Sequence, residues 1–483
     1  MRKRESTAIF GIRLLPACFL ATICGLLLTT CYLEGDINAL KPTSSDTPDD
    51  SFNPGSGTDD DPYKVHDDET LRKVGTGDGW EMDSHYIQID DIVLSPKPWD
   101  PIGYYIDDND NNTFTGSFDG GIYTISNLKI IGSTDDYQGL FGYIKGPNAQ
   151  VINVKLENVD INGDKNVGGV AGYVADGGHV TNCYSTGTVD GNENVGGVVG
   201  HVKGGGYVTN CSSAAEIGGN EYVGGVVGYI ENGGRVAYCF SACNITGRSN
   251  ATGGVVGYVD VVDDSDDINV ENCFSTGIVT GANYVGGVAG TNNKGKVANC
   301  YSTSDIRGNN ITGGVAGLNQ NGGNVTNCYS TGPVASDFDT AGGVVGMNTA
   351  GDATSKVENC VALGPSVTSS EDESTGRVAG DSSGTLSNNY ANSNMKVNGW
   401  EITADIADSD FGENKMHGAN VDEDSYDYGD HSTGGGSGYY NKDFWEVTLG
   451  WDDFDEHWEM HEGDSLPILQ GFPGVAQNPE IVP

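Results

Sequence analysis

Residues 297–330 read VANCYSTSDIRGNNITGGVAGLNQNGGNVTNCYS, and this stretch contains the two phrases that decide the fold. The phrase Val-x-Asn-Cys-aromatic-Ser begins at Val297 and again at Val325, and Gly-Gly-Val-Ala-Gly lies between them at residues 313–317. The apolar runs are short and are separated by glycine and asparagine, which does not match the 3.6-residue period of a helix. The stretch therefore predicts short strands joined by turns.

Both phrases recur along the chain. The Gly-Gly-Val-(Ala/Val)-Gly phrase begins at Gly168, Gly196, Gly224, Gly253, Gly286, Gly313 and Gly342. Variants begin at Gly139 and Gly376, and successive copies start 27 to 34 residues apart. The second phrase begins at Val180, Val208, Val236, Val270, Val297, Val325 and, in degenerate form, Val357. A fixed period of this length is typical of a repeat architecture.

A repeat of about 28 residues has room for about three short strands and three turns. When such coils stack, each strand pairs with its counterpart about 4.8 Å away, and equivalent side chains form columns. We therefore predict an all-β fold, a right-handed parallel β-helix of about 28-residue coils with N- and C-terminal caps. The valine columns would fill the core, and the asparagines would occupy left-handed corners.

The Gly-Gly-Val-x-Gly phrases, together with the Asn-Cys-Tyr-Ser phrase, resemble the GLUG-motif repeats of bacterial and archaeal surface proteins. Residues 99–103 (WDPIG), 114–120 (FTGSFDG) and 466–469 (LPIL) match the usual surroundings of that motif. The resemblance covers roughly residues 70 to 470. It implies a β-helix and an adhesin-like role at the cell surface, without a defined ligand.

Composition along the chain predicts five segments. A basic start and an apolar run that ends in residues 28–31 (LTTC) resemble a bacterial lipoprotein signal, with Cys31 as the lipidated residue; plain secretion is the alternative. The segments are 1–31, the signal peptide; 32–65, a disordered acidic tether; 66–137, an N-terminal cap and the first coils; 138–394, the repeat solenoid; and 395–483, a C-terminal aromatic cap with an acidic glycine-rich loop. We expect a surface lipoprotein attached to the outer membrane, or a secreted protein.

Acidic residues outnumber basic ones 68 to 24, which gives a formal net charge of −44. A surface of this charge repels nucleic-acid phosphates and anionic lipid headgroups, and it attracts cations and basic surfaces. We expect no nucleic-acid partner, and membrane contact only through the N-terminal lipid.

Seven cysteines occupy equivalent positions of the second phrase: Cys183, Cys211, Cys239, Cys273, Cys300, Cys328 and Cys360. Parallel side chains in register keep their Cβ atoms about 4.8 Å apart, beyond the preferred disulfide range of about 3.5–4.5 Å. Cysteine also packs well as a small hydrophobic residue. We predict a reduced, buried ladder in the core, with Cys243 as the partner of Cys239 if a bridge forms.

The residue after each of these cysteines forms a mostly aromatic column: Tyr184, Phe240, Phe274, Tyr301 and Tyr329, interrupted by Ser212. If the column faces out, its rings form a strip suited to sugar faces or to an extended protein partner. If it faces in, the rings belong to the core and the cysteines lie outside. On the first alternative we predict that these five residues bind a ligand.

Two acidic runs are candidates for calcium binding through oxygen ligands, at Asp107 and Asn109 and at Asp263 and Asp266, with solvated loops as the alternative. We expect no other cofactor. No paired carboxylates can be assigned to glycoside hydrolysis, so we expect no enzyme activity. The sequence predicts a non-catalytic, adhesion-type β-solenoid lipoprotein that presents an extended face to a glycan or a protein. A polysaccharide-active β-helix enzyme and a structural surface-layer component are the alternatives.

Overall fold

The computed structural model describes residues 53–104, 112–131, 134–262, 268–351, 353–370, 374–402, 416–421, 440–451, 454–460 and 465–472, and residues 477 and 479. All of these except 472 and 477 belong to one compact unit. In the part of the chain so described, no helix is long and apolar enough to cross a membrane.

From residue 165 onward, each coil contains at least four strands, not the three expected from its length. One coil consists of β10 (Lys165–Gly168), β11 (Ala171–Ala175), β12 (His179–Thr181) and β13 (Tyr184–Asp190). The additional strand arises at the glycine phrase, because residues 169 and 170 turn the chain between β10 and β11. The four strands form four walls around a narrow interior.

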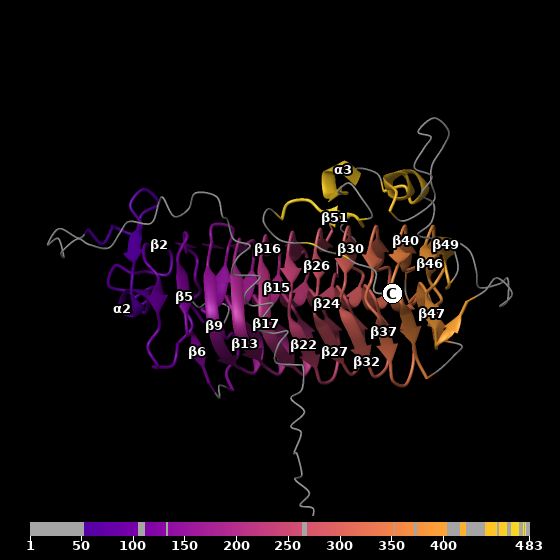
Figure 1. Cartoon of the computed structure of the whole chain (residues 1–483). Coiled ribbons are helices and arrows are strands. Elements are labelled where there is room, and N and C mark those ends of the chain that lie inside the picture. Colours follow the sequence, from indigo (N-terminus) through magenta and orange to yellow (C-terminus); the bar gives the residue numbers. More distant parts are fainter. Residues whose placement is uncertain are drawn as a thin grey trace, which may run out of the picture. The chain divides into compact units, whose positions relative to one another are not determined.

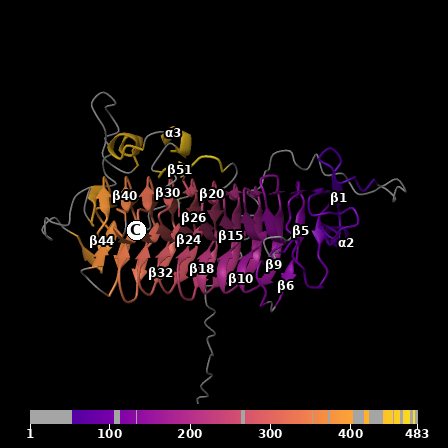
Figure 2. The same ribbon diagram turned by 180° about the vertical axis from the view of Figure 1, so that it is seen from behind.

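Equivalent strands of successive coils pair in parallel, so the coils lie side by side along one axis (Figures 1 and 2). One wall is a 12-stranded sheet that extends from β1 (Tyr63–Val65) to β45 (Thr385–Ser387). Two others are sheets of eight strands, from β10 to β43 (Thr375–Gly376), and of nine strands, from β7 (Phe141–Lys145) to β44 (Ala379–Ser382). The fourth wall contains β13 and its counterparts. The structure is a parallel β-solenoid, which confirms the predicted fold class.

Valine and cysteine columns fill the interior, as the repeat predicted. Val180, Val208 and their counterparts in the second phrase are at most 1 % exposed. The seven cysteines of the column are equally buried and are free thiols. The Sγ atom of Cys183 donates to the Thr181 carbonyl oxygen (3.3 Å), and the Cys183 amide donates to Cys211 Sγ (3.4 Å). Burial raises the pKa of the Cys183 thiol.

The two phrases of the repeat meet inside the coil. Ser185, the last residue of the first Asn-Cys-Tyr-Ser phrase, donates its hydroxyl hydrogen to the Gly197 carbonyl oxygen (2.5 Å). A Cβ atom on Gly197 would lie 2.3 Å from Ser213 Oγ and 2.4 Å from the Gly225 carbonyl oxygen. Glycine is required at this position because the neighbouring coil leaves no space for a side chain.

The asparagines of the second phrase form left-handed corners, as predicted. Asn182 and Asn210 have φ values of 55° and 53°. Their side chains also link neighbouring coils in places, since Asn182 Nδ2 donates to Asn153 Oδ1 (2.5 Å). Tyr238 occupies the same corner in the third copy, with a φ of 55°.

The N-terminal end of the solenoid begins earlier than expected. Strand β1 pairs with β2 (His85–Gln88), and the Tyr63 ring stacks on Trp80 at a centroid distance of 4.7 Å. The prediction that the acidic tether extends to residue 65 is therefore wrong for residues 53–65, which are folded. Aromatic packing on Trp80 supplies the buried surface that the local composition does not suggest.

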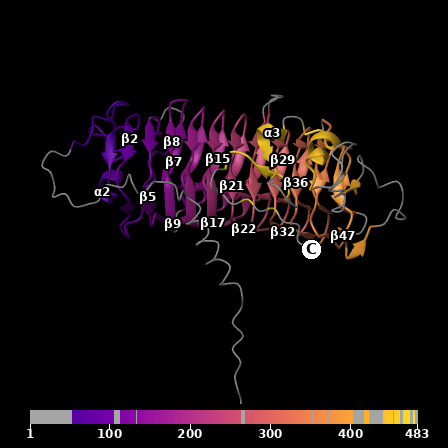
Figure 3. The same ribbon diagram turned by 45° about the horizontal axis from the view of Figure 1, so that its top comes forward.

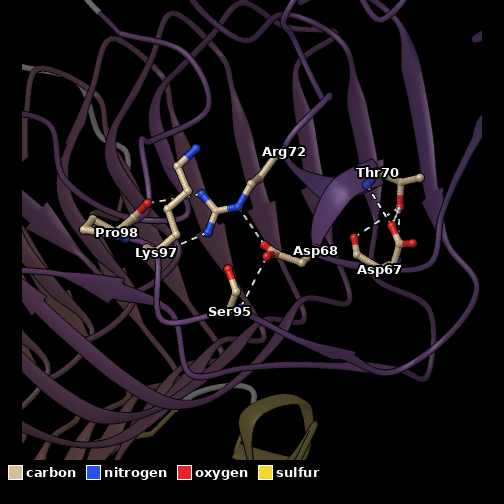
Figure 4. Close-up of polar contacts among 7 residues, drawn as sticks. All are labelled: Asp67, Asp68, Thr70, Arg72, Ser95, Lys97 and Pro98. Carbon is tan, nitrogen blue, oxygen red and sulfur yellow. Dashed lines mark hydrogen bonds and ion pairs between the residues drawn. The ribbon is translucent and has the colours of Figure 1, made fainter.

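A short helix, α2 (Asp68–Leu71), follows at this end (Figure 1), and Figure 4 shows its polar contacts. The Asp67 carboxylate caps it by accepting from the Thr70 amide (2.8 Å). The Arg72 guanidinium donates to Asp68 Oδ1 (2.7 Å) and to the carbonyl oxygens of Lys97 and Pro98 (3.0 and 3.1 Å). These contacts join the helix to the segment before the next coil.

The C-terminal segment differs from the predicted cap. Strands β47 (Lys396–Val397), β48 (Trp400–Glu401) and β49 (Ala419–Val421) complete the last coils, and Trp400 is exposed. The described residues from 440 to 471, which we call the strap, instead lie along one side of the stack, where α3 (Phe454–His457) is drawn over the strands (Figures 1 and 3). The tryptophans of the strap therefore cover a side wall and not the open end.

Candidate functional site

The predicted aromatic column faces away from the interior, and its rings are stacked. Phe240, Phe274, Tyr301 and Tyr329 lie on β21 (Phe240–Ser241), β26 (Phe274–Ser275), β31 (Tyr301–Ser302) and β36 (Tyr329–Ser330). Successive ring centroids are 5.2, 4.9 and 5.0 Å apart, with interplanar angles of 7° or less. The cysteine and serine on either side of each ring point inward, because the side chains of a strand alternate.

The strap covers the part of this column that contains Tyr301 and Tyr329. The Tyr329 hydroxyl donates to the Pro467 carbonyl oxygen (2.5 Å), and the Trp458 ring lies 6.2 Å from Tyr301 and 5.7 Å from Tyr329. Strap residues also bind the neighbouring coils, since Trp451 Nε1 donates to the Asn359 carbonyl oxygen (2.8 Å). Buried ring area and these hydrogen bonds hold the strap in place.

The expectation of a water-exposed strip is therefore wrong for most of the column. Phe240, Phe274, Tyr301 and Tyr329 are at most 9 % exposed, and only Tyr184 of the five is half-buried. Ligand binding by these residues stays a prediction. Cys31 and the calcium candidates Asp107, Asn109, Asp263 and Asp266 lie outside the described residues.

A second aromatic column, which the sequence analysis missed, lies on the nine-stranded sheet. It comes from β7, β11, β15 (Val199–Lys203), β19 (Val227–Glu231) and β24 (Val256–Asp260). Strand register places Tyr143, Tyr173, His201, Tyr229 and Tyr258 side by side. The sequence contains a signal for this column, because four of its members directly follow copies of the Gly-Gly-Val-x-Gly phrase: Tyr173, His201, Tyr229 and Tyr258. In the next coil the column continues with Thr291, which is not aromatic.

Two further tyrosines flank this column at left-handed corners. Tyr137 and Tyr222 have φ values of 61° and 55°. The Tyr137 ring lies 6.0 Å from Tyr143 and 5.7 Å from Tyr173. The Tyr222 ring lies 5.4 Å from Tyr229 and 4.8 Å from Tyr258. We call these seven residues the tyrosine face: Tyr137, Tyr143, Tyr173, His201, Tyr222, Tyr229 and Tyr258.

The centre of the tyrosine face is a buried histidine paired with a carboxylate. His201 Nε2 lies 3.3 Å from Glu231 Oε2, and Lys203 Nζ lies 3.0 Å from Glu231 Oε1. Burial lowers the pKa of His201, so the imidazole is neutral at pH 7. The proximity of His201, together with Lys203, lowers the pKa of Glu231 to about 2. The pair fixes the ring between Tyr173 and Tyr229.

Carboxylates border the rings. The Tyr229 hydroxyl donates to Asp260 Oδ2 (3.2 Å), and burial, with the charge of Asp260, raises the pKa of Tyr258 to about 12. At the other end of the face, burial and the charge of Asp164 raise the pKa of Asp136. These two aspartates and Tyr137 line an open hollow. Rings and hydrogen-bond acceptors together suit binding to a ligand surface.

Metal ligation is not evident in the region that the structure describes, where no three His, Cys, Asp or Glu side chains are grouped to hold an ion.

Part of the repeat region matches a known sequence motif. The GLUG motif matches residues 163–190, 281–307 and 308–335. Halomucin from Haloquadratum walsbyi is 36 % identical over 143 residues, which is 28 % of this chain, and the match spans about 2 % of Halomucin itself. A crystal structure of a Bacteroides ovatus protein, named as a candidate immunoglobulin A1 protease, aligns with a TM-score of 0.33 at 18 % identity, over 86 % of this chain and 94 % of that one.

Proposed function

We propose that this β-solenoid of GLUG-motif repeats is a non-catalytic binding module of the cell surface or the secreted fraction, which holds a glycan or a protein along its tyrosine face. The observation that carries the proposal is the register of the nine-stranded sheet, which aligns five aromatic rings in one column on an outer wall. The stretch shared with Halomucin supports a surface or secreted location.

The tyrosine face presents its aromatic rings on a rigid wall. Each ring presents a broad apolar face, and exposed clusters of this kind usually mark interaction sites. Hydrogen bonds between coils fix the strands beneath the rings, so little conformational entropy is lost when a ligand binds. Tyr173, Tyr229 and Tyr258 are half-buried, which leaves part of each ring available. In the other aromatic column, Phe240, Phe274, Tyr301 and Tyr329 are at most 9 % exposed and offer almost no such area.

The test is binding of the full chain to immobilised neutral polysaccharides and extracellular-matrix proteins, with and without Ca²⁺. We expect the double variant Tyr173→Ala/Tyr229→Ala to lose at least about fivefold in affinity, since each ring contributes about 0.5–1.5 kcal/mol. Tyr207→Ala is the matched control, because its half-buried ring stacks on His179 at 5.1 Å on the 12-stranded wall. Equal affinity of all three proteins would refute the site, and degradation of the ligand would favour a polysaccharide-active enzyme.

A further inference from the structure

We infer that the ligand of the tyrosine face is an extended cationic polypeptide, whose lysine or arginine side chains lie over the rings and between the carboxylates that border them. The inference rests on the proposed function and names its partner. Three observations carry it: the arrangement of the rings in two clusters, the charge around them, and a lysine of this chain that already occupies such a position.

The rings form two clusters that are three coils apart. Tyr137, Tyr143 and Tyr173 form the first, and Tyr222, Tyr229 and Tyr258 form the second. The His201 ring joins them, at 4.5 Å from Tyr173 and 4.6 Å from Tyr229. Since strands of neighbouring coils are about 4.8 Å apart, equivalent rings such as Tyr143 and Tyr229 are separated by about 14 Å.

This separation suits an extended chain that lies along the stack. Four residues of extended polypeptide span about 13–14 Å, and alternate side chains point to the same side. Basic residues at positions i and i+4 of such a chain would reach both clusters together. A residue at i+2 would lie above His201, which is neutral and does not repel it.

The charge of the face favours a cation over a neutral or anionic ligand. Three lysines lie along it, and each is already paired: Lys145 with Asp176, Lys165 with Glu193 and Lys203 with Glu231. Four more carboxylates have no lysine or arginine within ion-pair distance among the described side chains: Asp136, Asp164, Glu221 and Asp260. Both ring clusters therefore have a net negative charge beside them.

A lysine of the chain itself shows the arrangement. Lys145 Nζ lies 6.0 Å from the centre of the Tyr143 ring and 3.7 Å from Asp176 Oδ2. An ammonium group between a tyrosine ring and a carboxylate is the contact that we infer for the ligand. Such cation–π contacts contribute about 0.5–1 kcal/mol when exposed and about 2 kcal/mol when desolvated. Tyr229 and Tyr258, beside Asp260, offer the same pair of groups without a lysine.

The experiment measures the affinity of the full chain for a labelled decapeptide of alternating lysine and serine, by fluorescence anisotropy at two salt concentrations. We expect Tyr229→Leu/Tyr258→Leu to weaken binding about tenfold, at an unchanged net charge, because two cation–π contacts are lost. Asp260→Asn removes the adjacent charge and keeps the shape, and it should weaken binding about threefold or more. The controls are Tyr207→Leu and Glu216→Gln, which change a ring and an exposed carboxylate on other walls.

Non-specific attraction to a chain of formal charge −44 would be lost equally in Asp260→Asn and Glu216→Gln and would not respond to ring removal. That result would overturn the inference. If the ring variants instead lose binding to neutral glycans but not to the peptide, the proposed function stands and a cationic partner is excluded. If neither ligand responds to the ring variants, the inference and the proposed function both fail.

Discussion

Replacement of Tyr301 by alanine tests how the strap is held on the solenoid. The Tyr301 ring is 1 % exposed, and it lies between Phe274 and Tyr329 at centroid distances of 4.9 and 5.0 Å. Trp458 of the strap covers it from outside, at 6.2 Å. The substitution therefore removes two stacked contacts and leaves a cavity beneath the strap.

The expected loss of stability is large because the lost ring stacking and the new cavity occur at the same site. Truncation of a buried aromatic residue to alanine costs about 3–5 kcal/mol, and each aromatic pair contributes about 0.5–1.5 kcal/mol of that. We expect the free energy of unfolding to fall by about 3–4 kcal/mol. Tyr184→Ala is the matched control, since it belongs to the same column but is half-buried and should cost at most about 1 kcal/mol.

Urea unfolding followed by tryptophan fluorescence is the appropriate assay, because Trp445, Trp451 and Trp458 are all in the strap and report its detachment. Hydrogen exchange of the Trp458 and Leu469 amides gives an independent measure, since these residues face each other in the β50 (Trp458–Glu459) and β51 (Ile468–Leu469) pair. A loss below about 1 kcal/mol for Tyr301→Ala would refute the reasoning, because it would mean that the ring faces water and the strap does not cover it.

Three further substitutions give predictions for the core and the tyrosine face. Val297→Asp places a charge between the buried Val270 and Val325 and should cost several kcal/mol in urea unfolding, whereas Thr326→Asp, on an outward position, should cost under about 1 kcal/mol; equal losses would contradict the assigned core. Gly254→Ala would place a Cβ atom 1.9 Å from the Gly287 carbonyl oxygen and should lower the free energy of unfolding by about 1–3 kcal/mol. An unchanged melting temperature would mean that the two neighbouring coils are not in such close contact at Gly254. Glu231→Gln removes a carboxylate whose pKa is about 2 in the folded chain and near 4.5 in the unfolded chain. Above pH 4.5 the free energy of unfolding of the wild type should therefore exceed that of the variant by at most about 3 kcal/mol. Urea titrations should show this difference disappear as the pH falls from 4.5 toward 2. A difference that stays constant over this range would mean that the ionised Glu231 carboxylate does not stabilise the folded chain.

Much of the solenoid could be predicted because its signals repeat. Val180 and its counterparts are identical in every copy, and the left-handed corner at Asn182 follows from the residue type. The strand count per coil was wrong because the turn at residues 169–170 is short and leaves the length of the repeat unchanged. Length alone does not distinguish three walls from four.

The site was harder to predict, for two physical reasons. Strand alternation determines that Tyr301 points outward, but its burial depends on the strap, which does not repeat and therefore has no register with the coils. Tyr173 and Tyr229 could have been recognised from their place after the glycine phrase. The contribution of Tyr137 and Tyr222 could not, because two corner residues join the face only through the folding of a whole coil.

The strap also has a mechanical consequence. A solenoid pulled along its axis unravels coil by coil, since each coil contacts only its neighbours. The strap, however, contacts coils from Asn388, whose side chain donates to the Leu449 carbonyl oxygen (2.8 Å), back to Tyr238, against which Gly471 lies. Tension applied between residues 53 and 471 must therefore peel the strap from the wall before it loads the last coils. The first length that the molecule gains under force therefore uncovers the rings of Tyr301 and Tyr329.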